Sequence, residues 1–416
     1  MGAVTISAET IERAAERLAG VVVETPLQFN KRLSDATGAE VWLKREDLQP
    51  VRSYKLRGAY NLIAQLNAKQ RAAGVVCASA GNHGQGVAYA CARLGIRGQV
   101  FVPTTTPRQK RQRMRQLGEG WVELIIHGTN YDEAAALAAQ VADDQGRTLV
   151  PAFDDERTIA GQGTVAAEIV AQLGQAPNTL IVPVGGGGML AGCMAWLAER
   201  HPGTKVVGAE PSGAASMAVA LEAGRPRDLS KLDTFVDGAA VRRVGDLTFA
   251  IAQRLKPHMF SVPEGRICSE MLALYQTDGV IAEPAGALAS AALGIYRPSA
   301  GRTVVAIVSG GNNDLSRYDE IEERALVYEG RKHYFLVNFP QEPGALRRFL
   351  DDVLGPEDDI TLFEYVKRSN RETGPALVGI ELGDPDDLAG LLERIKASRI
   401  TVERVPPDSA FYRFVV

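Results

Sequence analysis

Between about Val75 and Asn312 the chain alternates short apolar, β-branched runs with longer amphipathic segments. This pattern is typical of a parallel sheet covered by helices, so we expect an α/β fold with mostly parallel sheets. Several of the runs end in glycine-rich or polar loops, and open α/β sheets bind ligands at the carboxyl ends of their strands. We therefore expect the ligand-binding and catalytic residues to lie in these loops. The main strand candidates are residues 75–79, 98–103, 122–126, 179–184, 205–210 and 303–309.

The pattern changes after Asn313. A highly charged segment at 314–332 indicates a helical or extended connector. The remaining strands and helices follow in the order β-α-β-β-α-β, which is the ferredoxin-like plan of an α+β domain. We find no internal repeat, so one such module is expected. Its predicted elements are the strand 333–339, the helix 343–354, the strands 360–366 and 376–382, the helix 386–398 and the strand 400–405.

Composition narrows the class of protein. A length of 416 residues allows two or three domains, and a net charge of -4 argues against a general nucleic-acid binder. The basic run from Arg108 to Arg115 has no interleaved aromatic residues, so a solvated helix face is favoured over an RNA site. No apolar run approaches the roughly 20 residues of a membrane span, and the N-terminus has an amphipathic helix pattern instead of a secretion signal. With four widely spaced cysteines, a cytoplasmic protein is predicted.

Three motifs carry candidate chemistry. Ser53 to Ala59 contains Lys55, whose position alone would suit a solvated surface residue. Ser79 to Gly86 leaves a strand and opens a helix, whose first N–H groups can hold an anion. Gly185 to Gly188 places four flexible residues after a strand, which suits close approach of the backbone to a phosphate. Rossmann and Walker loops fit less well, because the G-x-G-x-x-G and G-K-[ST] patterns are lacking.

Together and in this order, these motifs resemble those of the fold-type II pyridoxal-phosphate (PLP) enzymes, most closely threonine dehydratases and serine racemases. The resemblance implies two open α/β subdomains and PLP as the cofactor. It implies that Lys55 forms the Schiff base and then removes the α-proton, with Tyr54 standing where phenylalanine is common. Besides Lys55, the cofactor-binding residues implied are Asn82, Gly185, Gly186, Gly187, Gly188, Met189 and Ser309.

By the same resemblance, the loop after the first strand holds the substrate carboxylate. His83 is interpreted as a structural residue in preference to a catalytic base. Glu283 lies either near the cofactor ring or simply in the first turn of a helix. Serine racemases carry a second serine where this chain has Ala80, and an alanine cannot transfer a proton, so elimination is expected over racemisation. The implied substrate-binding residues are Ser79, Ala80, Gly81, Asn82 and His83.

The resemblance implies that the chain converts L-threonine to 2-oxobutanoate and ammonia, the first step of isoleucine biosynthesis. L-Serine, which has one methyl group fewer, should be a weaker substrate. Two alternatives stay open: a serine-directed dehydratase or racemase of the same fold, and a non-catalytic amino-acid sensor. Some relatives bind a divalent cation, but Ser216 replaces the needed carboxylate beside Glu210 and Ala214, so no metal is expected.

The C-terminal module resembles the ACT-like domain of biosynthetic threonine dehydratases at Asn338 to Leu346 and Ile360 to Tyr365. That implies feedback inhibition by isoleucine, with valine as a possible antagonist. The alternative is a dimerisation domain without a ligand. The family also implies a homotetramer. The expected domains are a catalytic domain at 1–315 with a smaller subdomain at about 55–150, a connector at 316–330 and a regulatory domain at 331–416.

Overall fold

The computed structural model describes residues 6–365, 372–398, 400–406, 409 and 412. The chain forms two compact units, Met1–Asp314 and Leu315–Val416, and each is described by itself. The first five residues of the N-terminal helix pattern and Val366, at the end of a predicted strand, lie outside the described residues. None of the helices in the described ranges is long and apolar enough to cross a bilayer.

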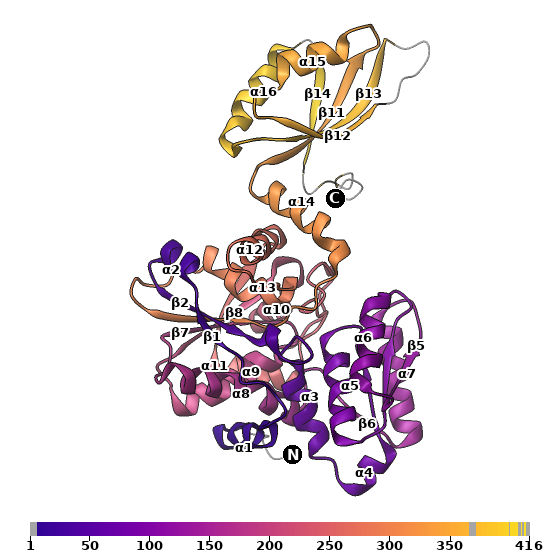
Figure 1. The fold of residues 1–416 in the computed structure, drawn as a ribbon, viewed down its shortest axis with the longest axis vertical. Coiled ribbons are helices and arrows are strands. Elements are labelled where there is room, and N and C mark those ends of the chain that lie inside the picture. Colours follow the sequence, from indigo (N-terminus) through magenta and orange to yellow (C-terminus); the bar gives the residue numbers. More distant parts are fainter. Residues whose placement is uncertain (1–5, 366–371, 399, 407–408, 410–411, 413–416) are drawn as a thin grey trace. The chain divides into compact units, whose positions relative to one another are not determined.

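A six-stranded sheet forms the larger part of the first unit (Figure 1). It is parallel except at one edge, where β1 pairs antiparallel with β2. All six residues of the inner strand β10 are buried, as expected for a strand covered on both faces. In sheet order the strands are β1 (Leu27–Phe29), β2 (Glu40–Arg45), β10 (Thr303–Val308), β7 (Thr179–Pro183), β8 (Lys205–Pro211) and β9 (His258–Val262).

Helices cover both faces of this sheet (Figure 1), with α8 and α9 on one face and α13 on the other. The core between the sheet and α8 and α9 joins Leu180, Val182 and Val305 to Ile159 and Leu190. The helices of this part are α1 (Ala8–Leu18), α2 (Lys31–Thr37), α8 (Glu156–Leu173), α9 (Gly188–Arg200), α10 (Ser216–Ala223), α11 (Asp246–Leu255), α12 (Glu264–Gln276) and α13 (Pro284–Ala291), with 3-10 turns η1 (Glu46–Leu48), η2 (Ser212–Ala214) and η3 (Ala292–Gly294).

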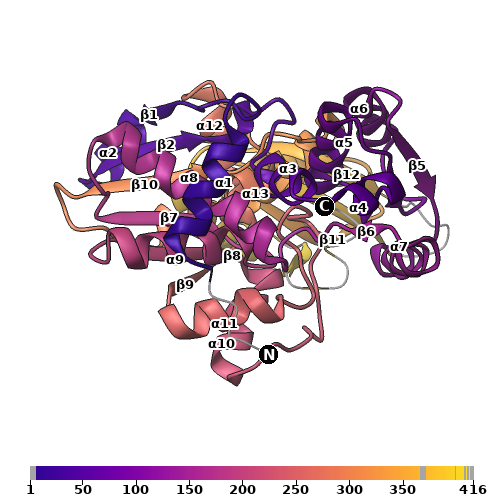
Figure 2. The same ribbon diagram turned by 90° about the horizontal axis from the view of Figure 1, so that it is seen from below.

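A second, four-stranded sheet in the first unit is parallel throughout and forms a separate group of elements in both views (Figures 1 and 2). One core cluster joins Leu62 of α3, Val87 of α5 and Met114 of α6 to β3 and β4. Another packs Ala134 and Ala138 of α7 on Val76. The elements are β5 (Val122–Ile126), β4 (Gly98–Val102), β3 (Val75–Ala78), β6 (Thr148–Leu149), α3 (Lys55–Ala64), α4 (Ala68–Ala73), α5 (Asn82–Leu94), α6 (Arg108–Gly118) and α7 (Tyr131–Gln145).

Buried ion pairs fix α3, the helix that begins at Lys55. The guanidinium of Arg57 donates to Glu46 at 2.7 Å and to Glu168 at 2.9 Å. The carboxylate of Glu46 is fully buried, and the charge of Arg57 holds its pKa below the usual value against the effect of burial. Removing one partner of such a pair leaves an uncompensated buried charge, which is strongly unfavourable. The first turn of α3 is therefore held at one place relative to η1 and α8.

The second unit contains a four-stranded antiparallel sheet with the strand order β12-β13-β11-β14. Phe335 and Val378 of the sheet form its core with Phe349 of α15 and Leu391 of α16. This is the ferredoxin-like order of elements predicted from the sequence, so the α/β plus α+β fold class is confirmed. The elements are η4 (Leu315–Arg317), α14 (Tyr318–Tyr328), β11 (Lys332–Pro340), α15 (Ala345–Val353), β12 (Asp359–Tyr365), β13 (Thr373–Glu381), η5 (Pro385–Asp387), α16 (Leu388–Ala397) and β14 (Thr401–Val405).

Four strands of the first unit, β1, β2, β6 and β9, lie outside the runs singled out in the sequence. The strands β1 and β6 have only three and two residues, too few to show an alternating pattern. In β2 the fully buried Lys44 interrupts the apolar run, because its amine pairs with Glu168 inside the protein. Pairing with neighbouring strands, not local hydrophobicity, makes these segments part of the sheets.

Candidate active site

The predicted site residues follow three strands of the two sheets of the first unit. Ser79 follows β3, Gly185 follows β7 after Val184, and Ser309 follows β10. The segment before α3 is tied to the end of β10, because the N–H of Tyr54 donates to the carbonyl of Ser309 at 3.1 Å. This bond and the β-bridge between Ser53 and Gly310 place Lys55 beside the carboxyl end of the large sheet.

Lys55 is the first residue of α3, and its Nζ donates to the carbonyl of Ala152 at 3.1 Å. The amine also lies 5.2 Å from the centre of the Tyr54 ring. Burial lowers the pKa of Lys55 to about 8, although the nearby carboxylate of Glu283 opposes the shift. A larger share of this amine is therefore neutral at physiological pH than of an exposed lysine. A neutral amine is the form that can attack an aldehyde and accept a proton.

The loop Gly185 to Gly188 has no room for side chains. A Cβ on Gly186 would lie 2.3 Å from the ring of Phe153, and one on Gly188 would lie 2.3 Å from Oε1 of Gln162. Gly187 has a φ of 90° and caps the 13-residue helix α9, which begins at Gly188. The loop thus leads into a helix N-terminus, where backbone N–H groups without helical partners favour a phosphate. The next residue, Met189, is buried in the core of the large sheet.

The loop from Ser79 to Asn82 ends at the N-terminus of α5. The N–H of Gly81 donates to the hydroxyl of Ser79 at 3.3 Å, and no side chain caps the helix. All four residues of this loop, including Ala80, are partly exposed. The uncapped helix end therefore presents N–H groups that suit a carboxylate.

Two hydrogen bonds hold the side chain of Asn82. Its Nδ2 donates to Oε1 of Glu283 at 2.5 Å, and its Oδ1 accepts from Nδ2 of Asn312 at 2.7 Å. Burial and the charge of Asp237 raise the pKa of Glu283 to about 7. A Cβ on Gly310 would lie 2.2 Å from the same carboxylate oxygen, so the glycine permits this contact. Glu283 therefore acts on the loop through Asn82.

His83 is buried, and its Nε2 contacts the carbonyl of Val150 at 2.7 Å. Since a carbonyl only accepts hydrogen bonds, this contact requires the proton on Nε2. Burial and the charge of Lys55 lower the pKa of His83 to about 4, so the ring is neutral at physiological pH. In this geometry His83 supports the loop, and Nε2 is not available as a base.

Ser309 is buried at the end of β10, and its hydroxyl donates to the carbonyl of Ala285 at 3.1 Å. Glu210 is fully buried, and its carboxylate accepts the N–H groups of Met217 at 2.6 Å and Ala218 at 2.9 Å. Burial raises the pKa of Glu210 to about 7. Within the described part of the chain, no group of three or more His, Cys, Asp or Glu side chains is arranged to hold a metal ion.

The sequence did not predict several residues that surround Lys55 and the loop Gly185 to Gly188. Ala152 and Phe153 follow β6, and Gln162 lies in α8, yet both Lys55 and Gln162 donate to the carbonyl of Ala152. The signal for Asn312 was present, since it ends the Ser-Gly-Gly-Asn motif after β10. No local sequence pattern could have indicated Ala152 and Phe153. Ala152 contributes only its backbone carbonyl, and Phe153 contributes only the packing of its ring against Gly186.

The basic side chains of α6 are exposed or half-exposed, as expected of a solvated face, but two of them have partners in the first unit. Nζ of Lys110 pairs with Asp237 at 2.6 Å, and Arg113 donates to the carbonyl of Pro50 at 3.1 Å. Arg108 and Arg115 are exposed. Part of this run therefore faces other segments of the first unit.

These features together test whether PLP would fit. A shielded amine with a lowered pKa, a loop without side chains at a helix N-terminus and a buried hydroxyl are the groups needed for its aldehyde, phosphate and ring nitrogen. The residues present fit the cofactor. The family model described as pyridoxal-phosphate dependent enzyme matches residues 3–310, and the model described as the C-terminal regulatory domain of threonine dehydratase matches residues 323–415.

Similar proteins narrow the family. The chain is 59% identical over 414 residues to "L-threonine dehydratase biosynthetic IlvA" of Mycobacterium tuberculosis H37Rv, covering 99% of this chain and 96% of that protein. The protein of the same name from Bacillus subtilis strain 168 is 47% identical, covering 99% and 98%. The processed form of threonine deaminase isoform 2 from Solanum lycopersicum superposes with a TM-score of 0.72 at 37% identity, covering 77% of this chain and 96% of that chain. The chain therefore belongs to the family of biosynthetic L-threonine dehydratases, PLP-dependent lyases.

Proposed function

We propose that this chain converts L-threonine to 2-oxobutanoate and ammonia with bound PLP, as the first step of isoleucine biosynthesis. The observation that carries the proposal is the shielded amine of Lys55 beside a loop of four glycines. The relatives named as biosynthetic L-threonine dehydratases support the choice of substrate. The reaction balances. The proton of Cα and the hydroxyl of Cβ leave together as one water molecule, and one water molecule is consumed later, when the amino group is released as ammonia.

We assign each site residue a role in this reaction. When bound, PLP withdraws electrons from the substrate and so makes the Cα proton acidic. The neutral amine of Lys55 accepts that proton. Backbone N–H groups at the start of α5, with Ser79 and Asn82, hold the substrate carboxylate. The cofactor phosphate would lie against Gly185 to Gly188 and the N-terminus of α9, and Ser309 would contact the ring nitrogen.

Elimination is favoured over racemisation because of Ala80. Racemisation needs a second acid or base on the face of the substrate opposite Lys55. The alanine methyl group cannot supply a proton, so position 80 offers no second acid or base. We expect L-serine to react more slowly than L-threonine, because it lacks one methyl group that an apolar pocket can bind.

We propose that the C-terminal unit binds isoleucine as a feedback inhibitor and that valine opposes it. Gly344, with a φ of 85°, caps α15 in the turn that follows β11, and the amino acid would bind at this turn. The centre of the Phe339 ring lies within 6.0 Å of the ring centres of Phe349, Phe363 and Tyr365. Such an aromatic cluster would suit an aliphatic side chain. A coupling of about 1 to 3 kcal/mol between effector and substrate would suffice for control.

We also propose that the chain forms a homotetramer in the cytoplasm and acts on small molecules, not on nucleic acids or membranes. The four cysteines, Cys77, Cys91, Cys193 and Cys268, are all buried and free of disulfides, which suits a reducing compartment. Analytical ultracentrifugation of the purified protein measures the assembly directly. A monomer at micromolar concentration would contradict the tetramer.

The decisive experiment measures keto acid and ammonia formed from L-threonine by the purified PLP-loaded chain. We expect equal amounts of both products, and a loss of about 10³-fold in turnover for Lys55→Ala, because the base is removed. If the wild-type protein binds PLP but forms no keto acid, the dehydratase proposal is wrong and a non-catalytic amino-acid sensor is favoured. A preference for L-serine, or formation of D-serine, would favour the serine-directed enzyme.

A further inference from the structure

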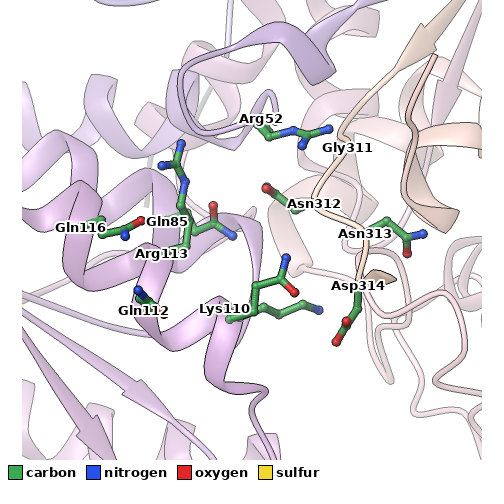
Figure 3. A pocket seen from close by; sticks show the side chains of 11 residues that line it. Arg52, Gln85, Lys110, Gln112, Arg113, Gln116, Gly311, Asn312, Asn313 and Asp314 are labelled. Atoms are coloured by element: carbon green, nitrogen blue, oxygen red, sulfur yellow. The ribbon is translucent and has the colours of Figure 1, made fainter. Parts of the chain in front are cut away.

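A cavity of about 480 Å³ lies in the first unit next to the candidate active site and shares Asn312 with it (Figure 3). Its walls come from α6, from the first turn of α5 and from the segment 311–314 after β10. Lys55, the four glycines and Ser309 are not among the residues that line it. The volume is within the range of about 300 to 1,000 Å³ that is usual for small-molecule sites.

Three cationic side chains line this cavity: Arg52, Lys110 and Arg113. Asp314 is the one carboxylate among the lining residues, and the Asp237 carboxylate pairs with Lys110. Arg52 has a φ of 55°, a left-handed conformation that is unfavourable for an arginine. Such backbone strain is concentrated at functional sites, where the surrounding structure maintains it. The wall therefore has a positive balance of charge and a strained arginine.

Two amide side chains in the wall, one buried and one partly exposed, have buried polar atoms without partners within the described ranges. The side chain of Gln85 is 1% exposed, and its Oε1 has no hydrogen-bond partner within the described ranges. Neither Oδ1 nor Nδ2 of Asn313 has one there. Figure 3 shows Gln85, Lys110 and Asn312 projecting into the space between α6 and the segment after β10. Buried polar atoms are normally paired, so these atoms indicate a ligand with both donors and acceptors.

We propose that this cavity binds a small phosphorylated organic molecule. Its phosphate would contact Arg52 and Arg113, because the planar guanidinium group matches two phosphate oxygens at once. Hydroxyl or amide groups of the same molecule would pair with Gln85 and Asn313. A phosphate is favoured over a single carboxylate because it carries more charge at pH 7, about -1.5 to -2. The cavity is also larger than inorganic phosphate alone would fill.

The same cavity contacts the substrate loop through one side chain. Asn312 lines the cavity, and its Nδ2 donates to Oδ1 of Asn82 at 2.7 Å and to the carbonyl of Val51 at 2.8 Å. A ligand that forms a hydrogen bond with Asn312 would weaken the hydrogen bond from Asn312 to Asn82. The affinity of the loop for the substrate carboxylate would then change. This coupling rests on the proposed function, whereas binding to the cavity does not.

Isothermal titration calorimetry on the full-length PLP-loaded protein tests binding. Inorganic phosphate and glycerol 3-phosphate are titrated in chloride buffer of matched ionic strength. We expect one saturable site per chain and tighter binding of glycerol 3-phosphate, whose hydroxyls reach the amides. Arg113→Gln should weaken binding about ten-fold, since a charge-assisted hydrogen bond is lost. Arg115→Gln, an exposed arginine of the same helix outside the cavity, is the matched control and should bind as wild type.

Lys110→Gln serves as a second variant if Arg113→Gln does not fold, and it should also weaken binding. Absence of saturable binding, or equal binding by Arg113→Gln and Arg115→Gln, overturns the proposal. The coupling is tested by the KM for L-threonine, which should shift with glycerol 3-phosphate in wild type but not in Arg113→Gln. Binding without a KM shift overturns the coupling. Binding by a chain that forms no keto acid contradicts only the proposed function.

Discussion

At the scale of single residues, the environment of Lys55 decides its chemistry. Its amine is shielded by the fold and donates to a backbone carbonyl, and the charge of the Glu283 carboxylate acts on it. Burial disfavours the ammonium form more than this carboxylate favours it, so the pKa falls. The result is an amine that is poised to act as nucleophile and base near neutral pH.

The lowered pKa gives a pH prediction for cofactor attachment. Below about pH 8 the folded protein holds Lys55 as an ammonium ion that cannot attack an aldehyde, and above it the amine is neutral. The rate at which PLP becomes trapped on Lys55 by borohydride should therefore rise around pH 8, instead of near the roughly 10.4 of a free lysine. Peptide mass spectrometry identifies the modified residue. A midpoint near 10 would contradict the proposed environment of the amine.

Ala80 gives the second prediction at this scale. Ala80→Ser places a hydroxyl where a proton donor is lacking, so conversion of L-serine to D-serine should rise by about ten-fold or more. Chiral chromatography of the reaction mixture measures it. The control Ala80→Gly changes the side chain without adding a hydroxyl and should form no more D-serine than wild type. If both variants behave alike, the hydroxyl is not the determinant.

At the scale of elements, the sharp turn between β7 and α9 shapes the site. Gly187 adopts a positive φ, while Gly186 and Gly188 lie against Phe153 and Gln162. The wall of the loop is thus supplied by residues after β6 and in α8. The absence of side chains on Gly186 and Gly188 lets these neighbours lie against the loop that leads to the N-terminus of α9.

Gly186→Ala tests this arrangement. The added Cβ would lie 2.3 Å from the ring of Phe153, so either the loop or the ring must move. We expect PLP to bind about ten-fold more weakly, measured by equilibrium dialysis and absorbance. Gly203→Ala is the control, because a Cβ there meets nothing within 4 Å. Equal PLP affinity in the two variants would show that the loop tolerates a side chain.

At the scale of the whole molecule, the chain divides at Asp314 into two compact units, each with its own core. The first contains all the candidate site residues, and the second has the ferredoxin-like sheet. Chemistry and effector binding are therefore assigned to separate units. Such an arrangement allows one unit to be removed without removing the residues of the other.

A chain that ends after Asp314 should therefore keep turnover of L-threonine and lose its response to isoleucine. Initial rates with increasing isoleucine measure both properties, and the full-length chain is the reference. We expect inhibition only in the full-length chain, since the proposed effector site is then absent from the shorter one. Inhibition of the shorter chain would place the effector site in the first unit.

Much of the molecule could be predicted from the sequence because its signals are local. Strand ends followed by glycine, the lysine motif and the β-α-β-β-α-β order are all encoded within short segments. These patterns predicted the α/β and ferredoxin-like folds, and the resemblance they support predicted the PLP family, both of which are confirmed. A periodic pattern reports which face of an element is buried, so class and order follow from it.

Tertiary structure alone decided how residues far apart in the chain meet. The carbonyl of Ala152 lies at Lys55 across 97 positions, and Glu283 meets Asn82 across 201. The pKa values of Lys55 and Glu283 follow from burial that only packing creates. The cavity beside α6 likewise required Arg52, Gln85 and Asn313 to be brought together. Local sequence patterns do not predict these contacts between distant residues, because the contacts depend on how the sheets and helices pack.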